Sequence, residues 1–379
     1  MKSALCERLG IEFPLFAFSH CRDVVAAVSR AGGMGVFGAV TLPPDRLEEE
    51  LSWIDDHVDS KPYGVDLIVP NQIEGKGQAF DEEQLLAAVP DAHKQFTAGL
   101  LASRDIPVDD LDDERREHVR FAKNLQEGGA GELLEVAFSH PIKLIANALG
   151  VPPQVMLDMG KQHGVAVAAL VGAKEHAIRQ VNAGVDILVV SGGEAGGHCG
   201  DVSTLVLVPE VCDAVRPVSD VPILAAGGIV TGRQMAACMA MGADGAWTGS
   251  VWLTTAEAET NPVVKEKMLK ASSRDTVRSR SRTGKPSRQL RSPWTDAWES
   301  GESPPPLPMP LQSLVSEPAL RKLDKLAQGG HAGAGELATY WVGQGVGLMN
   351  QENSVRAVVQ EFQEDFLAAY ERLGEFLGD

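Results

Sequence analysis

The sequence predicts a closed eight-stranded (β/α)8 barrel, the TIM-barrel class of α/β folds. Eight short apolar runs alternate with helical segments over roughly the first 250 residues, and this count over this length is typical of a closed barrel rather than an open sheet. The run from Val185 to Val190 is almost entirely apolar, as expected of a parallel strand covered on both faces. The predicted strands lie at 13–18, 35–40, 64–69, 143–149, 165–171, 186–190, 222–226 and 245–249.

One connection is too long for an ordinary β–α loop. Residues 71–140, after the third strand, carry 15 acidic and 7 basic side chains and helix-like stretches at 81–88 and 109–126. We expect a helical insertion over the carboxyl end of the barrel, where specificity elements usually lie, although a peripheral decoration fits the same pattern.

The alternation of strands and helices ends after residue 250. A basic loop, a stiff proline-rich connector at 303–310 and C-terminal helices follow. The last helix, 354–376, carries an apolar stripe at helical spacing, for which packing on the barrel is the first expectation and a homodimer contact the second. We therefore divide the chain into a ligand-binding barrel at 1–255, which includes the acidic insertion, and an extension at 256–379 that packs on it.

Composition excludes several classes of protein. A net charge of -18 disfavours nucleic-acid binding, and the lack of an apolar run of about 20 residues predicts no membrane span. No signal peptide is apparent, so a soluble, cytoplasmic protein is expected. The five cysteines show no paired spacing, and no metal site is predicted.

Basic side chains concentrate in one segment despite the acidic total. Residues 265–291 hold ten Lys or Arg against Glu266 and Asp275. Either this is a solvated loop with weak local pairing, or it contacts an anionic small molecule such as a nucleotide.

A glycine-rich turn after the sixth strand ends in a histidine. Gly192, Gly193, Gly196 and Gly197 remove the β-carbons that would keep a ligand from the backbone, and His198 follows them directly. A histidine titrates near neutral pH, so His198 is a candidate general base beside a bound anion.

Two further glycine turns follow the last two predicted strands. They contain Gly227 and Gly228, and Gly249 and Ser250. In a barrel, backbone N–H groups after strands seven and eight commonly bind a phosphate. Neither a Walker loop nor a G-x-G-x-x-G motif is present, so the three turns together predict one phosphorylated ligand.

These motifs resemble the nitronate monooxygenase family, flavin-dependent barrels formerly called 2-nitropropane dioxygenases. The family also includes FMN-dependent enoyl-acyl-carrier-protein reductases and quinone reductases. The resemblance spans nearly the whole chain, and its strongest pieces lie at 26–35, 61–65, 193–200, 224–229, 241–245 and 283–288.

The resemblance implies that the phosphorylated ligand is FMN. The phosphate would lie on the backbone near Gly228, Gly249 and Ser250, and His198 would face the flavin as the catalytic residue. The flavin contacts that it implies are Ala17, Phe18, Ser19, Asp66, Ser191, Gly192, Gly196, Gly227, Gly228, Thr248, Gly249 and Ser250.

Three positions depart from the family pattern. Residues 16–22 replace the usual Ala-Pro-Met-Ala-Gly loop, Asp66 replaces an asparagine, and Ser191 replaces a glutamine. Asp66 could contact the flavin and alter its redox potential, or pair with a nearby cation at the strand end. His20 could bind substrate or cap the first helix of the barrel.

The resemblance favours a nitronate monooxygenase-type enzyme that oxidises a small carbanionic substrate with O2. His198 would act as the base or bind the anionic oxygens. An NAD(P)H-dependent FMN reductase of an enone, an enoyl thioester or a quinone is the alternative, which the basic segment favours mildly. A flavin-binding barrel without chemistry is the third hypothesis.

Overall fold

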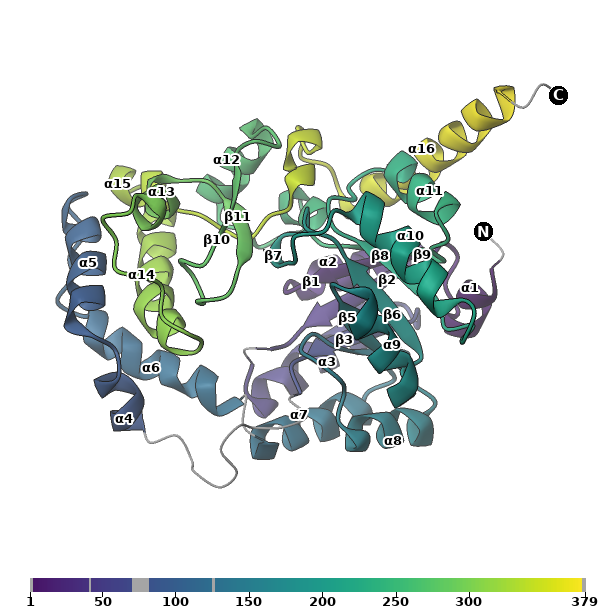
Figure 1. The fold of residues 1–379 in the computed structure, drawn as a ribbon, viewed down its shortest axis with the longest axis horizontal. Coiled ribbons are helices and arrows are strands. Elements are labelled where there is room, and N and C mark those ends of the chain that lie inside the picture. The colour runs from purple at the N-terminus through teal and green to yellow at the C-terminus, as the bar shows by residue number, and fades with distance from the viewer. Residues whose placement is uncertain (1–2, 41, 70–81, 125–126, 377–379) are drawn as a thin grey trace.

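A computed structural model describes residues 3–40, 42–69, 82–124 and 127–376 (Figure 1). Eight parallel strands close into a barrel in the order β1-β2-β3-β4-β5-β6-β8-β9, and β9 pairs with β1. The predicted (β/α)8 barrel is therefore confirmed. Its strands are β1 (Leu15–Ser19), β2 (Met34–Gly38), β3 (Tyr63–Leu67), β4 (Leu144–Asn147), β5 (Ala166–Val171), β6 (Ile187–Ser191), β8 (Ile223–Ala226) and β9 (Gly245–Thr248).

The two-residue period of each strand separates an inner from an outer apolar cluster. Alternate residues point into the barrel, and their neighbours pack against the surrounding helices. On β1, for example, Phe16 lies in the inner cluster, whereas Leu15 and Ala17 lie in the outer one. The inner cluster is a packed core of Phe16, Met34, Val36, Leu144, Ala146, Ala166, Ala168, Ile187, Val189, Leu224, Ala226 and Trp247.

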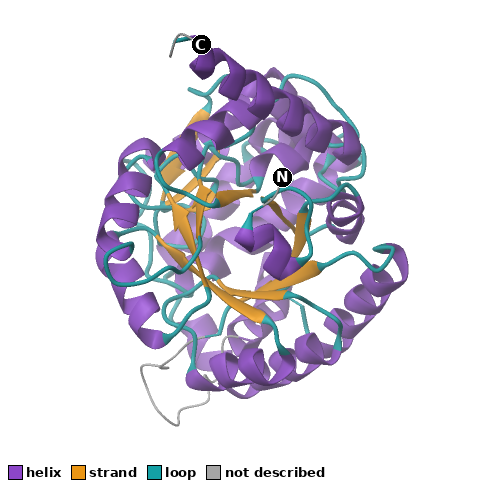
Figure 2. Ribbon diagram, turned by 90° about the vertical axis from the view of Figure 1, so that its right-hand side faces the viewer, coloured by secondary structure: helices purple, strands orange, loops and turns teal. Residues whose placement is uncertain are grey.

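A short N-terminal helix covers one end of this core. Helix α1 (Ala4–Leu9) begins at an N-cap, Ser3, and buries Leu5, Cys6 and Leu9 in the inner cluster. Figure 2 shows this helix within the ring of strands. Because α1 covers the amino ends of the strands, their carboxyl ends form the open face of the barrel.

Helices alternate with the strands around the outside of the barrel (Figure 2). Gly184 and Gly242 follow two of them with φ of 89° and 108°, the left-handed conformation expected from the sequence. The outer helices are α2 (Arg22–Arg30), α3 (Pro44–His57), α7 (Glu127–Ser139), α8 (Gln154–His163), α9 (Lys174–Ala183), α10 (Thr204–Val215) and α11 (Gly232–Ala240).

The predicted helical insertion after strand three is confirmed, and it shares a helical layer with the C-terminal extension. Helices α5 and α6 of the insertion contact α14, so this layer crosses the predicted domain boundary at residue 255. It lies beside the barrel at the carboxyl ends of the strands (Figure 1). Its helices are α4 (Glu82–Ala87), α5 (Asp91–Ala102), α6 (Leu111–Asn124), α13 (Pro293–Glu299), α14 (Leu311–Gln328) and α15 (Ala332–Leu337).

A three-stranded antiparallel sheet connects this helical layer to the barrel. Its order is β10-β11-β7, where β7 (Gly197–His198) is the end of the predicted glycine turn. The other two strands, β10 (Thr276–Ser279) and β11 (Ser287–Leu290), come from the basic segment. That segment, which also contains α12 (Pro262–Lys270), is therefore largely regular structure rather than the solvated loop considered above.

The last helix, α16 (Val355–Glu375), packs on the barrel along its first half only. Val355, Val358, Val359 and Phe362 are buried against α11 and α2, whereas the second half extends away from the barrel (Figure 1). Its exposed apolar side chains are Leu367, Tyr370 and Leu373, followed by Phe376. The packing is as predicted, and the homodimer contact stays a prediction.

Two 3-10 helices complete the connections around the open face of the barrel. They are η1 (Ser250–Thr254), directly after β9, and η2 (Gln344–Leu348), before α16. Across the described ranges, no helix combines the length and the apolar character that a membrane span requires.

We predict that Phe362→Ala destabilises the protein by about 3–5 kcal/mol, the usual cost of removing a buried aromatic side chain. Phe362 is 1% exposed and stacks on Trp252, with 6.4 Å between ring centroids. Urea unfolding measures the change. Tyr370→Ala, in the same helix but 71% exposed, is the matched control and should change stability little. Equal losses in the two variants would contradict this packing.

Candidate functional site

Three glycine turns at the carboxyl ends of β6, β8 and β9 meet one further segment, residues 343–345. Gly343 donates its N–H to Ser250 Oγ at 2.8 Å. A β-carbon on Gly343 would lie 2.6 Å from the carbonyl of Glu194, and one on Gly345 would lie 2.9 Å from the carbonyl of Gly228. The turns after β6 and β8 are therefore in backbone contact with this segment, which only glycine permits, and the turn after β9 contacts it through the Ser250 hydroxyl.

Several backbone donors in these turns have no acceptor. Among the described residues, the N–H groups of Gly227, Gly228, Gly249 and Ser250 make no hydrogen bond, and all four residues are half-buried. A phosphate accepts several backbone N–H bonds at once, and the left-handed φ of Gly227 and Gly228 is typical of such a nest. The predicted phosphate site thus has uncommitted donors.

Sequence reasoning missed residues 343–345. The signal was present as Val342-Gly-Gln-Gly-Val-Gly347, with three glycines at alternate positions. Because this segment lies about 90 residues beyond the last barrel strand, nothing in the local pattern connected it to the turns. The Glu194 carbonyl accepts the N–H of Gln344 at 2.9 Å and joins the two.

Other glycines of the turns have a packing role. A β-carbon on Gly192 would lie 2.2 Å from Thr204 Oγ1, and one on Gly227 would lie 2.8 Å from the same atom. Thr204 in turn donates its N–H and hydroxyl to the Glu194 carboxylate at 2.7 and 2.9 Å. Gly192 and Gly227 therefore allow the turns to close around Thr204, while Gly196 contacts Gly343.

His198 lies at the edge of the open face, on β7. It pairs across the small sheet with Ser287 of β11. Its Nε2 is 2.7 Å from the hydroxyl of Thr283, in the β10–β11 loop. Within the described part of the chain Nδ1 has no hydrogen-bond partner, so this ring nitrogen is the one available to a ligand.

The surroundings of His198 favour its neutral form. The residue keeps exposed surface, while one side of its ring faces Thr283 and the Trp341 ring lies 6.4 Å from it, centroid to centroid. This partial removal from water lowers the pKa of His198, and the nearby charges of Lys285 and Arg282 lower it further. His198 is therefore a free base at neutral pH, next to two cationic groups.

Asp66 lies inside the barrel near the carboxyl end of β3. It is 3% exposed, and among the described residues its Oδ1 has no hydrogen-bond partner. Burial raises the pKa of Asp66 well above its usual value, which favours the protonated carboxyl. No cation of the described residues pairs with Asp66, so of the two roles considered for it the structure offers no support for the ion pair at the strand end.

Two aromatic side chains lie beside Asp66 at the open face. Phe18 and His20 are in edge-to-face contact, with 5.1 Å between ring centroids, and a β-carbon on Gly38 would meet both rings at 2.8 Å. His20 Nδ1 bonds the carbonyl of Gly38 at 2.7 Å, and partial removal of the ring from water lowers the pKa of this imidazole, although the residue keeps exposed surface. His20 thus lies over the end of β2 and does not cap α2, whose N-cap is Cys21.

The two-residue period of the strands decides which of the other predicted flavin contacts face the barrel interior and which lie in its wall. Ser191 has the same parity as the inward-facing Val189 and lies at the open end of the barrel. The side chains of Ala17 and Thr248 lie in the barrel wall, where Thr248 Oγ1 donates to the carbonyl of Phe16 at 2.9 Å. Ser19 accepts the N–H of Cys21 at 3.1 Å. Ala17 and Thr248 therefore offer a ligand only backbone groups.

Most basic side chains of the basic segment, residues 265–291, bond other groups of the protein. Eight of its ten Lys and Arg side chains bond protein groups, as Arg288 does with the Gly193 carbonyl and Arg278 with Asp201. Of this segment, Arg274 and Lys285 are exposed without such a bond. Lys285 is the one of these two that lies near His198.

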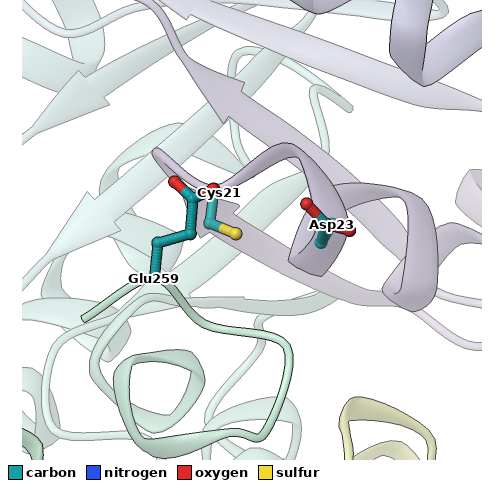
Figure 3. Close-up of side chains that lie close together, drawn as sticks. All are labelled: Cys21, Asp23 and Glu259. Atoms are coloured by element: carbon teal, nitrogen blue, oxygen red, sulfur yellow. The ribbon is translucent and has the colours of Figure 1, made fainter. Parts of the chain in front are cut away.

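One cluster of potential metal ligands lies at the start of α2. The ligand atoms of Cys21, Asp23 and Glu259 are within 4.8 Å of one another (Figure 3). Cys21 donates its thiol to the Glu257 carbonyl at 3.3 Å, and burial raises its pKa. The thiol is thus already engaged by a backbone carbonyl, and no metal site is proposed at this cluster.

Comparison with known proteins gives a consistent result. A sequence profile described as nitronate monooxygenase matches residues 2–365. A Mycobacterium tuberculosis protein provisionally named a monooxygenase is 53% identical over 369 residues, 97% of each chain. A Staphylococcus saprophyticus protein provisionally named a nitronate monooxygenase is 26% identical over 372 residues, 93% of this chain and 94% of that protein.

Solved structures extend the comparison to the fold. FabK from Thermotoga maritima superposes with a TM-score of 0.72 at 26% identity, covering 99% of both chains. A nitroalkane oxidase from Streptomyces ansochromogenes superposes with a TM-score of 0.78, covering 98% of this chain and all of that chain. The latter is 24% identical, so its likeness concerns the fold alone.

We predict that Asp66→Asn gains stability relative to the wild type as the pH rises above about 4. Ionisation of Asp66 is opposed in the folded state, so wild-type stability falls between the unfolded pKa near 3.9 and the raised folded pKa. Each pKa unit by which the folded value exceeds the unfolded value lowers the free energy of unfolding by about 1.4 kcal/mol, and asparagine, which does not ionise, avoids that loss. Urea unfolding of both proteins at pH 5 and pH 8 measures the difference. The exposed Asp56→Asn serves as control, and a pH-independent difference for Asp66→Asn would contradict the buried neutral carboxyl.

Proposed function

Because the chain belongs to the nitronate monooxygenase family, we propose that it is an FMN-dependent enzyme that oxidises a small carbanionic substrate, such as an alkyl nitronate, with O2. Family membership makes it a flavin-dependent oxidoreductase. The identity of the flavin as FMN, the substrate and the oxidant are the proposed parts.

The observation that carries the proposal is the set of uncommitted N–H donors where the glycine turns meet. Gly228, Gly249 and Ser250 would hold the FMN phosphate, and the close packing of Gly196 against Gly343 holds two of the segments together beside them. Phe18, Asp66 and Ser191 lie at the open end of the barrel, where the flavin ring would lie. A bound flavin would supply transfer of one or two electrons between substrate and oxidant.

Asp66 fits the edge of a flavin ring as a neutral group. A protonated carboxyl both donates and accepts a hydrogen bond, as the amide that it replaces in the family does. Its Oδ1 has no partner among the described residues, so the buried carboxyl has bonding capacity left for a ligand. The departure from the family pattern is therefore compatible with a flavin.

His198 would act on the substrate through Nδ1. A neutral imidazole can take a proton from the carbon next to a nitro group, or bind the oxygens of the resulting anion once protonated. Lys285 and Arg282 place positive charge around the ring, which favours an anionic substrate beside it. The reductase alternative was favoured mildly by the basic segment at 265–291. Most of its basic side chains bond protein groups, so they no longer favour that alternative.

We predict that His198→Ala retains FMN but loses at least about 100-fold in kcat/KM for an alkyl nitronate, the usual contribution of a general acid–base group. The visible spectrum of the purified variant reports the flavin, and oxygen consumption reports turnover. His176→Ala, at an exposed position on α9, is the matched control and should keep full activity. Full activity of His198→Ala would remove the histidine from the proposed mechanism.

We predict that anaerobic mixing with an alkyl nitronate bleaches the flavin absorbance rapidly, whereas NADH and NADPH leave it unchanged. In the proposed reaction the carbanionic substrate donates electrons to the flavin, and O2 accepts them. Without O2 the flavin should therefore stay reduced after it reacts with the nitronate. Stopped-flow absorbance measures both arms, and mass analysis of the released cofactor tests whether it is FMN. Rapid bleaching by a pyridine nucleotide alone would instead support the reductase, and a flavin that reacts with neither would support a binding protein.

A further inference from the structure

The partner of His198 lies in a tight loop between β10 and β11. Gly284 donates its N–H to the Arg280 carbonyl at 2.9 Å, and the Arg280 side chain returns a bond of the same length to the Gly284 carbonyl. Gly284 has a φ of 83°, and a β-carbon there would lie 2.0 Å from the carbonyl of Leu307. The backbone around Thr283 is therefore closely confined.

Helix α14 holds the same loop through buried polar contacts. The carbonyl of Ser281 accepts bonds from Gln312 Nε2 at 2.7 Å and from Ser316 Oγ at 2.5 Å. Gln312 and Ser316 lie one turn apart on α14 and bond each other at 3.0 Å. Helix α14 of the helical layer thus fixes the backbone at Ser281, two residues before Thr283.

Arg282 adds a buried ion pair to this contact. Its Nε and Nη2 donate to the two carboxylate oxygens of Glu317 on α14, at 2.6 and 3.2 Å. The Arg282 and Glu317 side chains are 8% and 14% exposed, and the guanidinium lies 4.0 Å from the Trp341 ring centroid. A bidentate, stacked arginine is held in one geometry, and lysine cannot reproduce it.

We propose that the Arg282–Glu317 pair and Thr283 are positioning residues for His198. The pair anchors the loop, and the Thr283 hydroxyl holds Nε2, so that Nδ1 is the nitrogen presented to the substrate. Partners of this kind fix the orientation and tautomer of a histidine. The inference rests on the proposed function of His198 for its catalytic consequence, while the positioning itself is independent of the reaction.

The same arrangement sets the charge around His198. The groups that face it from the β10–β11 loop are Lys285 and Arg282, both cationic. Glu317 and, further back on α6, His118 lie near Arg282, so the carboxylate neutralises the guanidinium from the side of the helical layer. Removing the whole pair takes one cation away from His198, which should raise the pKa of the imidazole.

We predict that Thr283→Val moves the Nε2 resonance of His198 and lowers kcat by about five- to tenfold, the effect of one lost hydrogen bond. Valine keeps the shape of threonine, so the fold should persist. Long-range proton–nitrogen NMR spectra of the flavin-loaded protein report the ring, and His198→Gln identifies its signals among the nine histidines. Thr283→Ser retains the hydroxyl and should restore both the resonance and kcat.

The ion pair is tested in the same spectra. In the double variant Arg282→Met with Glu317→Met, the His198 titration midpoint and the acidic limb of kcat/KM should both move to higher pH. Arg282→Lys keeps the charge but not the bidentate geometry, so it should lower kcat with little change in that midpoint. Arg274→Met, at an exposed position of the same segment, is the matched control.

Specific outcomes would overturn the proposal. An unchanged Nε2 resonance in Thr283→Val excludes the positioning role, and so does a failure of Thr283→Ser to restore it. A His198 midpoint that does not rise in the double variant excludes the role of the pair. If His198→Ala stays fully active while the resonances move as expected, the positioning inference stands and the proposed base fails.

Discussion

The close approach of four backbone segments at the open end of the barrel is the constraint on which the site depends. The turns after β6, β8 and β9 meet residues 343–345 at distances that leave no space for side chains at Gly196, Gly343 or Gly345. This contact leaves N–H groups of the last two turns without acceptors, half-buried and close together. The proposed phosphate site rests on that geometry, because an anion can accept several backbone N–H bonds at once.

The same constraint ties the helical layer to the barrel. Residues 343–345 lie between that layer and α16, and the small sheet β10-β11-β7 makes the second connection, at His198. The histidine belongs to a barrel turn, but its hydrogen-bond partner and the charges around it belong to the β10–β11 loop held by α14. The surroundings of His198 at the open face therefore depend on packing outside the barrel, and one continuous apolar cluster joins the helical layer to the barrel wall.

Departures from the family pattern can be interpreted from their surroundings. Asp66 replaces the amide of the family pattern within an apolar barrel interior, and burial raises the pKa of its carboxyl, which favours the neutral form. His20 lies in the region of the unusual first loop and bonds the end of β2 rather than capping a helix. Both changes preserve uncharged, hydrogen-bonding groups around the space where a flavin ring would lie, which is what a planar heterocycle requires.

The sequence by itself determined the barrel and the three glycine turns, and it located His198 at the end of one of them. Periodicity and glycine placement are local properties, and each strand end could be located from its own residues. Only the tertiary structure decided that Gly343 contacts the turns, that the Thr283 hydroxyl bonds His198, and that no cation of the described residues pairs with Asp66. These contacts join residues up to about 150 positions apart, and no local pattern encodes which distant segment fills a neighbouring space. The basic side chains of residues 265–291 are obvious in the sequence. Only the structure shows that most of them bond carboxylates and carbonyls of the protein, several from distant parts of the chain.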